Sequence, residues 1–580
     1  MINEIIDLDM SFFVKAEQSL KDRKLDLALN EVQNFKNKNN LVNFTLVPYK
    51  IALLEIVLHF QLANVGDTNY FISCGKLTAD YLNNNPEIKP VEVINLLTIM
   101  GECFCRISSK ENALSTFEKI LSIDENNHLI RMKSLVLAKE LQKISKARII
   151  GKQLLEVTCP YYIPALFVFF DLAIFHQNKI LSLKYIDLLI KVSETFDISQ
   201  LHRLFSGIIN ISEYEKAYEF YTHIKIDLSA VYQFDIGLTD IYLFRKDYKS
   251  ALSCLAHINS TDIASLQDRK LIESKRAKAF AGIKDYEQAF KYFSLSADLQ
   301  EQLCFEEVVN QGHYNNYQVK CLDIDLIQLN EKIKVEQKII PLDQPIIFNI
   351  GFPRSGTTLL DTVFDTQPVL QTLTEIGAID SVIIFMHNNL NKRYPEDLLQ
   401  LTSEEIKQLR HQYLTYVVNF LEGADISVTP LTTLVDKMPT NTRNIPLILC
   451  LFPNAKFIVS LRHPMDCTLS LFQQDIVSNS LTTDMTTLKA CVKCYIDMFN
   501  AFEYCQKHLD FSVHFVKYED LITNFEQTTN KIFDFIGVDN IDPSYLTFNE
   551  SAKDRIINTC SKDQVTQGLY QTSLYKWLNY

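Results

Sequence analysis

The feature that most constrains the fold is a pattern that recurs through the first half of the chain. In each of six helical segments, one residue recurs beside bulky apolar neighbours. These residues are Ala113, Ala147, Leu181, Ala217, Ala251 and Ala289, and five of the six are small. Their successive separations are 34, 34, 36, 34 and 38 residues. Since closely packed helices leave no room for a large side chain, this period predicts antiparallel helix pairs that stack as a solenoid. We expect an all-α array over residues 1–320, with Ala28 in the same array and no defined register before residue 105.

This pattern resembles the tetratricopeptide repeat, which has a similar length and a small residue at a comparable point of its second helix. The only tryptophan is Trp577, so the tryptophan expected early in that repeat is absent. The resemblance implies a concave surface suited to an extended peptide or protein. Helices that pack together and bind nothing are the alternative.

Composition limits the class of protein. A chain of 580 residues with 47% hydrophobic and 22% charged residues is typical of a globular protein with at least two domains. The net charge of −13 argues against a nucleic-acid partner. The start "MINEIIDLDMSFFVKAEQ" lacks the pattern of a signal peptide, and "ALFVFFDLAIF" is too short to cross a membrane. Thirteen cysteines, used as buried apolar residues, favour a reducing compartment, and we expect a cytoplasmic protein without a membrane partner.

The pattern changes after residue 320. Residues 321–344 are predicted to be a linker, and residues 345–580 a second domain. Strand-like runs at 346–350, 432–436, 456–461 and 513–517 alternate there with amphipathic stretches. Strands alternating with helices predict an α/β domain of the P-loop type with a central parallel sheet.

The stretch "IIFNIGFPRSGTTLLDTVF" predicts an anion site. A buried strand, a glycine-containing turn from Gly351 to Gly356 and a helix from Thr357 would place main-chain N–H groups at a helix N-terminus. A nucleoside-triphosphate loop needs lysine where this chain has Thr357, and its cation, Arg354, lies upstream. The run "KFIVSL" is followed by Arg462 rather than by a magnesium ligand, so a metal-dependent triphosphatase fits poorly and we expect no metal.

Several ordered motifs resemble sulfotransferases that use 3′-phosphoadenosine 5′-phosphosulfate, in particular the protein-tyrosine sulfotransferase branch. They are "GFPRSGTTLL", "LVDKMPTNTRNIPLILCLFPNAKFI", "FIVSLRHPMDCTLSLF", "FVKYEDLI" and "CSKDQVTQGLYQTSLYKWLNY". The resemblance implies that the sulfated nucleotide, and its product 3′-phosphoadenosine 5′-phosphate, contact Gly351, Arg354, Ser355, Gly356, Thr357, Thr358, Arg462, Ser470, Tyr518, Ser561 and Lys576. Arg462 and Ser470 would hold the 3′-phosphate.

The resemblance also implies the catalytic groups. Arg354 and Lys437 would neutralise charge on the leaving phosphate, and Glu375, 21 residues after Arg354, would be the general base. Four other carboxylates compete for that role: Asp361, Asp365, Asp380 and Asp436. We expect Asp361 and Asp365 to point away from the site, and Asp436 to orient Lys437.

The chain departs from its relatives at Gln367 and Thr566, and the stretch after Glu375 is apolar, which leaves the acceptor contacts open. A tyrosine in a peptide or protein is the favoured acceptor. A carbohydrate or small-molecule hydroxyl is the alternative within the enzyme class, and a repeat scaffold with an inactive sulfotransferase-like domain is the alternative outside it. The sequence leaves the oligomeric state open.

Overall fold

The computed structural model describes residues 25–38, 49–65, 68–226, 228, 231–311, 324–339, 345–429, 432–475, 485–557, 559, 561–569 and 571–580. The chain forms two compact units, the first ending at Leu172 and the second running from Ala173 to Tyr580. The second unit contains both the later repeat helices and the parallel sheet. Within the described ranges, no helix combines the length and the apolarity that crossing a bilayer requires.

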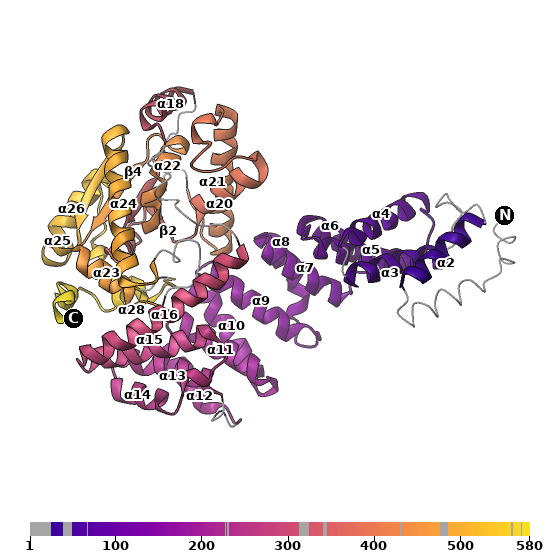
Figure 1. Cartoon of the computed structure of the whole chain (residues 1–580), viewed down its shortest axis with the longest axis horizontal. Helices are drawn as coiled ribbons and strands as arrows, with labels where there is room; N and C mark the ends of the chain where they lie inside the picture. Colours follow the sequence, from indigo (N-terminus) through magenta and orange to yellow (C-terminus); the bar gives the residue numbers. More distant parts are fainter. Residues whose placement is uncertain are drawn as a thin grey trace. The chain divides into compact units, whose positions relative to one another are not determined.

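The first unit is all-helical (Figure 1). Its helices are α2 (Leu25–Lys38), α3 (Tyr49–Val65), α4 (Asn69–Asn84), α5 (Pro90–Arg106), α6 (Lys110–Ile123), α7 (His128–Glu140), α8 (Ile144–Gly151), the 3₁₀ turn η3 (Lys152–Leu155) and most of α9 (Tyr162–Phe175). Ala28, the earliest member of the predicted array, is fully buried in α2. The apolar run "ALFVFFDLAIF" lies in α9, where Leu166 and Phe170 are core residues.

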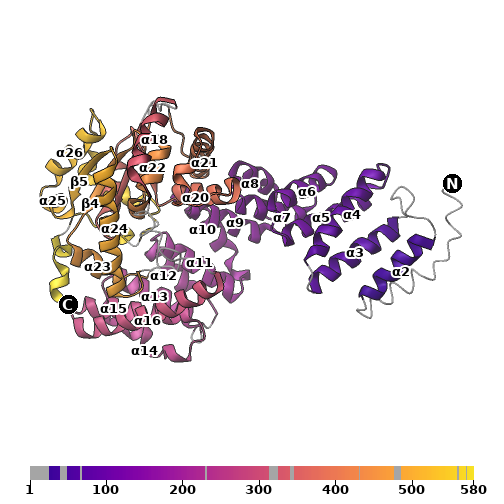
Figure 2. The same ribbon diagram turned by 45° about the horizontal axis from the view of Figure 1, so that its top comes forward.

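The array continues in the second unit. Its helices are α10 (Lys179–Val192), α11 (Ile198–Asn210), α12 (Tyr214–His223), α13 (Tyr232–Phe244), α14 (Tyr248–Ala256), α15 (Leu266–Gly282) and α16 (Tyr286–Gln311). Figure 2 shows these helices following one another as stacked hairpins. The predicted helical-repeat architecture is therefore confirmed for the described residues.

The repeats share one turn geometry. A residue with positive φ, between 55° and 66°, lies five positions before each buried small residue: Ser108, Gln142, Gln177, Ser212, Lys246 and Lys284. The next amide donates to the carbonyl five residues back, as Ser109 N does to Phe104 O at 2.8 Å. This is the hydrogen bond of a Schellman-type helix end. The period of the array is thus set by the turn as much as by the small residue.

The predicted register was wrong by one residue in the third segment. Leu181 is only half-buried, whereas Ser182 is fully buried and lies five residues after the turn residue Gln177. With Ser182 in place of Leu181, the separations become 34, 35, 35, 34 and 38. A small and fully buried residue then occupies all six positions of the series, as the packing argument requires.

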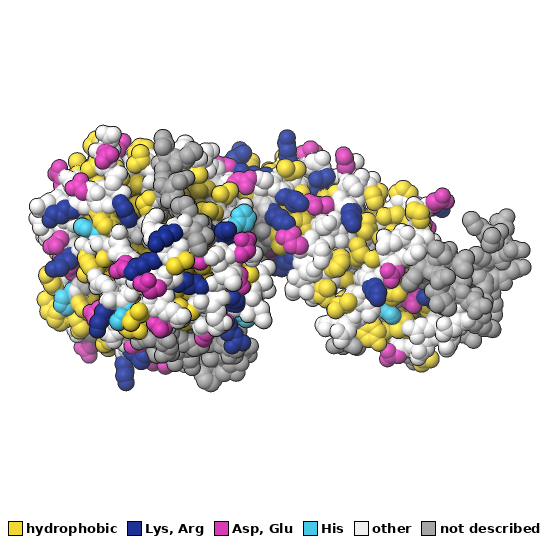
Figure 3. Space-filling view, turned by 90° about the horizontal axis from the view of Figure 1, so that it is seen from above, with side chains coloured by type: hydrophobic (Ala, Val, Ile, Leu, Met, Phe, Trp, Pro, Cys, Tyr) yellow, Lys and Arg dark blue, Asp and Glu magenta, His cyan; other side chains and the backbone are white. Residues whose placement is uncertain are grey.

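Ion pairs connect neighbouring repeats. Lys133 pairs with Glu102, Lys216 with Asp187 at 2.8 Å, and Arg245 with Glu215 at 2.5 Å. Their members lie about one repeat apart, and most are partly exposed, so each pair contributes little stability. On the face drawn in Figure 3, basic and acidic side chains are interspersed.

The predicted parallel sheet is confirmed. Five strands run in the order β2-β3-β1-β4-β5, and every neighbouring pair is parallel. They are β1 (Ile347–Gly351), β2 (Leu370–Thr374), β3 (Thr433–Lys437), β4 (Lys456–Leu461) and β5 (Ser512–Lys517). Four lie within one residue of the predicted runs, and β2 was not predicted.

Helices cover both faces of the sheet, and β1 contributes to both cores. Ile347 packs into a core with α19 (Thr357–Phe364), α25 (Tyr518–Thr523), α26 (Phe525–Ile536) and α27 (Phe548–Lys553). Phe348 and Ile350 pack into the opposite core with α18 (Leu326–Ile339), α20 (Ala378–Leu390), α21 (Ser403–Gly423), α22 (Ile445–Leu451) and α24 (Leu488–His508). In such a doubly wound sheet, ligands bind beyond the carboxyl ends of the strands.

Two further helices lie beside that edge. Helix α23 (Pro464–Phe472) follows β4, and the four-residue helix α28 (Lys562–Val565) lies near the C-terminus. Cys491 and Cys494 are 0% and 3% exposed in α24, so their predicted packing in a core is confirmed. No disulfide is formed among the eleven described cysteines.

Candidate functional site

The turn after β1 is built for close approach of main-chain atoms. Gly351 has φ 154°, and a Cβ there would lie 2.7 Å from the carbonyl oxygen of Ser460 on β4. Gly356 has φ 104°, and a Cβ there would lie 2.6 Å from the ring of Tyr518. A side chain at either position would displace its neighbour, so both glycines are required for a loop that wraps tightly at the start of α19.

Two buried polar residues fix this loop. The hydroxyl of Thr442 accepts a hydrogen bond from the Gly351 amide at 3.0 Å. Asn349 Nδ2 donates a hydrogen bond to the carbonyl oxygen of Thr357 at 3.0 Å. Neither contact was predicted. Thr442 lies 91 residues from Gly351 in the sequence, so it carries no local signal of contact with the loop. Ser355 is 1% exposed, and its hydroxyl has no hydrogen-bond partner among the described residues. It is therefore available to an anion in the loop.

Arg354 joins three parts of the site. Its backbone has φ 72°, a strained conformation for arginine, and strain of this kind clusters at functional sites. Its guanidinium donates to Ser470 at 3.1 Å, to Gln564 at 2.9 Å and to Ser561. The residues after β1, helix α23 and the C-terminal segment thus converge on one side chain.

A second arginine completes the basic wall. Arg462 follows β4 and donates from Nη1 to the carbonyl oxygen of Arg354 at 3.1 Å. Its guanidinium carbon lies 4.7 Å from the centre of the Tyr518 ring, within range of a cation–π contact. Desolvation, together with the positive charges of Arg354 and Arg462, lowers the pKa of Lys576. Three basic residues that the sequence analysis assigned to the nucleotide therefore lie near one another.

A pocket opens between these elements. Six of the predicted nucleotide contacts line it: Arg354, Gly356, Thr358, Arg462, Tyr518 and Ser561. The rest of its wall is formed by Leu359 of α19, Ile522 of α25 and residues of the C-terminal segment, including Gln564 and Leu569. The pocket lies at the ends of β1 and β4, where connections leave the sheet in opposite directions, which is the usual position of a ligand in this architecture.

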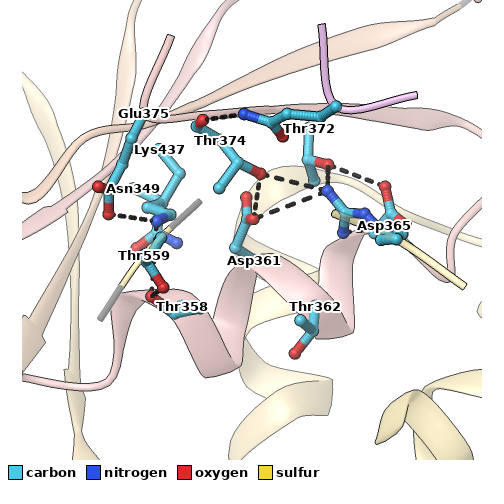
Figure 4. A network of polar contacts seen from close by, with 12 residues as sticks. Asn349, Thr358, Asp361, Thr362, Asp365, Thr372, Thr374, Glu375, Lys437 and Thr559 are labelled. Atoms are coloured by element: carbon cyan, nitrogen blue, oxygen red, sulfur yellow. Dashed lines mark hydrogen bonds and ion pairs between the residues drawn. The ribbon is translucent and has the colours of Figure 1, made fainter. Parts of the chain in front are cut away.

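Glu375 and Lys437 form an ion pair beside the loop (Figure 4), with 2.6 Å between the carboxylate oxygen and Nζ. Glu375 follows β2 and Lys437 ends β3, and the Glu375 amide donates to the Lys437 carbonyl oxygen at 2.8 Å. Lys437 is fully buried, and its Nζ lies 3.5 Å from the hydroxyl of Thr358. Glu375 is partly exposed and has φ 52°, so it is a second strained residue at this edge.

Asp361 lies closer to this centre than predicted. Its Oδ2 accepts a hydrogen bond from the Thr374 hydroxyl at 2.6 Å. Burial raises the pKa of Asp361, and the neighbouring charge of Lys437 opposes this rise. Arg555 lies within ion-pair distance of both acids on α19, 3.9 Å from Asp361 and 3.0 Å from Asp365. The expectation for Asp361 was wrong because α19 turns this residue toward β2, a strand that was not predicted (Figure 4).

Asp436 is a buried acid behind Lys437. It is 2% exposed and accepts the hydroxyl of Tyr413 at 2.9 Å. Burial raises the pKa of Asp436 to about 7, with Tyr413 lowering it and the nearby charges of Asp380 and Asp361 raising it further. Among the described residues, no group of three or more His, Cys, Asp or Glu side chains is placed to bind a metal ion.

The geometry brings the predicted residues together at one edge of the sheet. Gln367 is buried elsewhere: its side-chain oxygen accepts a hydrogen bond from the Asp542 amide at 2.8 Å, and its Nε2 donates to the Asp542 carbonyl oxygen at 3.0 Å. Sequence analysis missed Gln564 and Thr559, which contact Arg354 and Thr358. Gln564 stands three residues after the predicted Ser561, and this helical spacing could have identified it.

The fold and the site define an α/β class with a five-stranded parallel sheet and, after β1, a loop that contains arginine and lacks the P-loop lysine. Residues 345–543 match the family model described as Sulfotransferase family, so this region is a domain of that family.

The curated proteins that are similar to the chain include an uncharacterized protein of Aquifex aeolicus, which is 24% identical over 72% of this chain and 53% of its own length. A protein-tyrosine sulfotransferase of Drosophila melanogaster is 24% identical over 34% of this chain and 38% of its own length. The chain thus spans about half the length, or less, of these relatives. A crystal structure of a Mycobacterium avium sulfotransferase aligns with 46% of this chain and 79% of its own at 14% identity, with a TM-score of 0.24, too low to carry an argument.

Proposed function

We propose that this protein is a sulfotransferase that moves a sulfuryl group from 3′-phosphoadenosine 5′-phosphosulfate to a hydroxyl acceptor. The observation that carries the proposal is the pocket between Arg354, Arg462 and Tyr518, with the Glu375–Lys437 pair at the adjoining strand ends. The sulfotransferase-family domain over residues 345–543 supports it.

The residues present fit the nucleotide. The buried hydroxyl of Ser355 and the amides at the start of α19 would bind the 5′-phosphosulfate. Arg462 and Ser470 would hold the 3′-phosphate, with Lys576 adding positive charge. Gly356 would let the loop approach beside Tyr518, which would contact the nucleotide.

The bound donor supplies an activated sulfuryl group whose bond to the 5′-phosphate oxygen breaks as the acceptor oxygen bonds to sulfur. Glu375 lies 2.6 Å from Nζ of Lys437, and it would take the proton that the acceptor hydroxyl loses. Lys437, Thr358 and Arg354 would stabilise the negative charge that develops on the leaving phosphate. Positioning and charge stabilisation of this kind make up most of catalysis in the related phosphoryl transfers.

A tyrosine in a peptide or protein is the proposed acceptor. Similarity to a protein-tyrosine sulfotransferase supports this choice. The repeat helices of the second unit support it as well, because solenoids bind extended polypeptides. Nine of the eleven described cysteines are buried, a usage that fits a reducing, cytoplasmic setting, which we include in the proposal.

Calorimetry with 3′-phosphoadenosine 5′-phosphate tests the nucleotide assignment. We expect micromolar or tighter binding that survives EDTA, and much weaker binding of magnesium-ATP. A radiolabelled-sulfate assay with tyrosine peptides, their phenylalanine counterparts and oligosaccharides tests the acceptor. Preference for magnesium-ATP would contradict the proposed donor, and labelling of the oligosaccharides alone would contradict the tyrosine acceptor.

A further inference from the structure

Residues 561–569, the wall segment, contact two different parts of the second unit. Ser561 and Gln564 accept hydrogen bonds from the Arg354 guanidinium. Lys562 and Asp563, between them in sequence, contact residues at the α11–α12 turn. Because positions i and i+3 share a helix face, this short helix presents one face to the nucleotide pocket and the other to the repeat array.

Tyr214 is the main anchor on the repeat side. Its hydroxyl lies 2.9 and 3.1 Å from the two carboxylate oxygens of Asp563, to which it donates. The ring is 4% exposed and stacks on Phe244 with 4.3 Å between centroids. Desolvation and the Asp563 charge raise the pKa of Tyr214, so the hydroxyl remains a donor at neutral pH. A hydrogen bond to an ionised acceptor from a rigid, buried ring is a strong constraint on the segment.

Lys562 adds a second contact to the same turn. Its ammonium lies 3.3 and 3.2 Å from the carbonyl oxygens of Ile209 and Asn210, the last two residues of α11. A cation is favoured at a helix C-terminus, where the helix dipole is negative and carbonyl groups lack helical partners. The wall segment is thus attached to the array by two adjacent residues of opposite charge.

We propose that Tyr214 is a positioning residue for nucleotide binding, although it lies in the repeat array. By holding Asp563 it fixes Ser561 and Gln564, and these two residues orient the Arg354 guanidinium toward the pocket. Without the anchor, the wall segment and Arg354 must be ordered when the nucleotide binds, which lowers affinity. The identity of the nucleotide rests on the proposed function, whereas the chain of contacts from Tyr214 to Arg354 does not.

Tyr214→Phe tests this series of contacts, because the substitution keeps the stacked ring and removes only the hydroxyl donor. We expect 3′-phosphoadenosine 5′-phosphate to bind roughly tenfold more weakly by calorimetry. Tyr232→Phe is the matched control: its hydroxyl donates to Asp268 at 2.8 Å within the same array and contacts no part of the pocket. Both variants lose one tyrosine–aspartate hydrogen bond, and the control is expected to bind the nucleotide as the unaltered protein does.

Hydrogen exchange in the nucleotide-free protein gives a second measurement. Tyr214→Phe is expected to speed exchange of the wall-segment amides, and Tyr232→Phe is not. Asp563→Asn keeps an acceptor for Tyr214 and should give an intermediate affinity. Normal affinity and normal exchange in Tyr214→Phe would overturn the inference. Faster exchange in a protein that binds no sulfated nucleotide would support the anchor and contradict the proposed function.

Discussion

Gln177 donates a hydrogen bond from its side-chain amide to the carbonyl oxygen of Thr374, with 2.9 Å between nitrogen and oxygen. Thr374 ends β2 and precedes Glu375, whose own amide donates to Lys437. The main chain around Glu375 is therefore held from two sides while Glu375 itself has a positive φ of 52°. A residue of the repeat array thus supports the strained backbone of the proposed general base.

Gln177→Ala is predicted to lower kcat about tenfold and leave the KM for the sulfated nucleotide unchanged. The reason is geometric: a small displacement of the base costs rate, while the nucleotide contacts lie elsewhere. Steady-state kinetics at saturating acceptor measure both constants.

Asn178→Ala is the control for that variant. Asn178 belongs to the same turn and donates to the carbonyl oxygen of Ala424 at 2.9 Å, away from Glu375. It also caps α10 through Leu181, so its loss should lower Tm without lowering kcat. Equal losses of kcat in both variants would mean that the turn supports the fold and does not position the base.

Glu375→Gln is predicted to lower kcat by roughly 10²- to 10⁴-fold, the usual contribution of a general base. Affinity for 3′-phosphoadenosine 5′-phosphate should stay within a few-fold, because Glu375 does not line the proposed nucleotide pocket. Single-turnover sulfate transfer and calorimetry measure the two effects. Asp361→Asn replaces the other acid near Lys437, and if it removed turnover while Glu375→Gln did not, Asp361 would be the base.

Arg462→Ala is predicted to weaken binding of 3′-phosphoadenosine 5′-phosphate by roughly 10- to 100-fold, because hydrogen bonds to a charged group contribute about 1.5–3 kcal/mol. Turnover at saturating donor should change much less. Arg393→Ala removes an exposed arginine of the same unit and should leave binding unchanged. Loss of turnover with normal affinity in Arg462→Ala would assign this arginine to the chemical step.

Local patterns predicted most of the elements that form the site. Four strands had apolar runs, and the loop from Gly351 to Gly356 had its glycines, so backbone sterics identified them. The strand β2, "LQTLT", was not predicted because three of its five residues are polar. Without β2, the orientation of Asp361 toward the site could not be predicted either.

Pairings between distant residues could not be predicted. The Glu375–Lys437 ion pair depends on β2 lying beside β3, an order that only the folded sheet defines. The contacts of Tyr214 with Asp563 and of Gln177 with Thr374 depend on how helices of the array pack in the second unit. Ser182 was missed because Leu181 and Ser182 fit the period equally well, and only the turn geometry at Gln177 distinguishes them.

Asp436 gives a prediction about pH and stability. Its pKa is about 7 in the folded protein, compared with 3.8 for an ordinary aspartate, with burial as the main cause. Between these two values the folded state binds one proton more than the unfolded state. The free energy of unfolding should therefore decrease as pH rises, by about 1.4 kcal/mol per pH unit from this group. The stabilising contribution is complete below pH 3.8 and is lost by the time pH exceeds 7.

Asp436→Asn cannot ionise and still offers Tyr413 an acceptor, so its stability relative to the unaltered protein should increase from pH 5 to pH 7 and then level off. Urea unfolding at pH 5, 6, 7 and 8 measures the difference, because the denaturant midpoint follows stability when the slope is constant. Asp539→Asn, at an exposed position, controls for the loss of one negative charge. A stability difference that stays flat across this range would mean that Asp436 ionises normally, and the buried acid behind Lys437 would then be a permanent negative charge beside the proposed site of transfer.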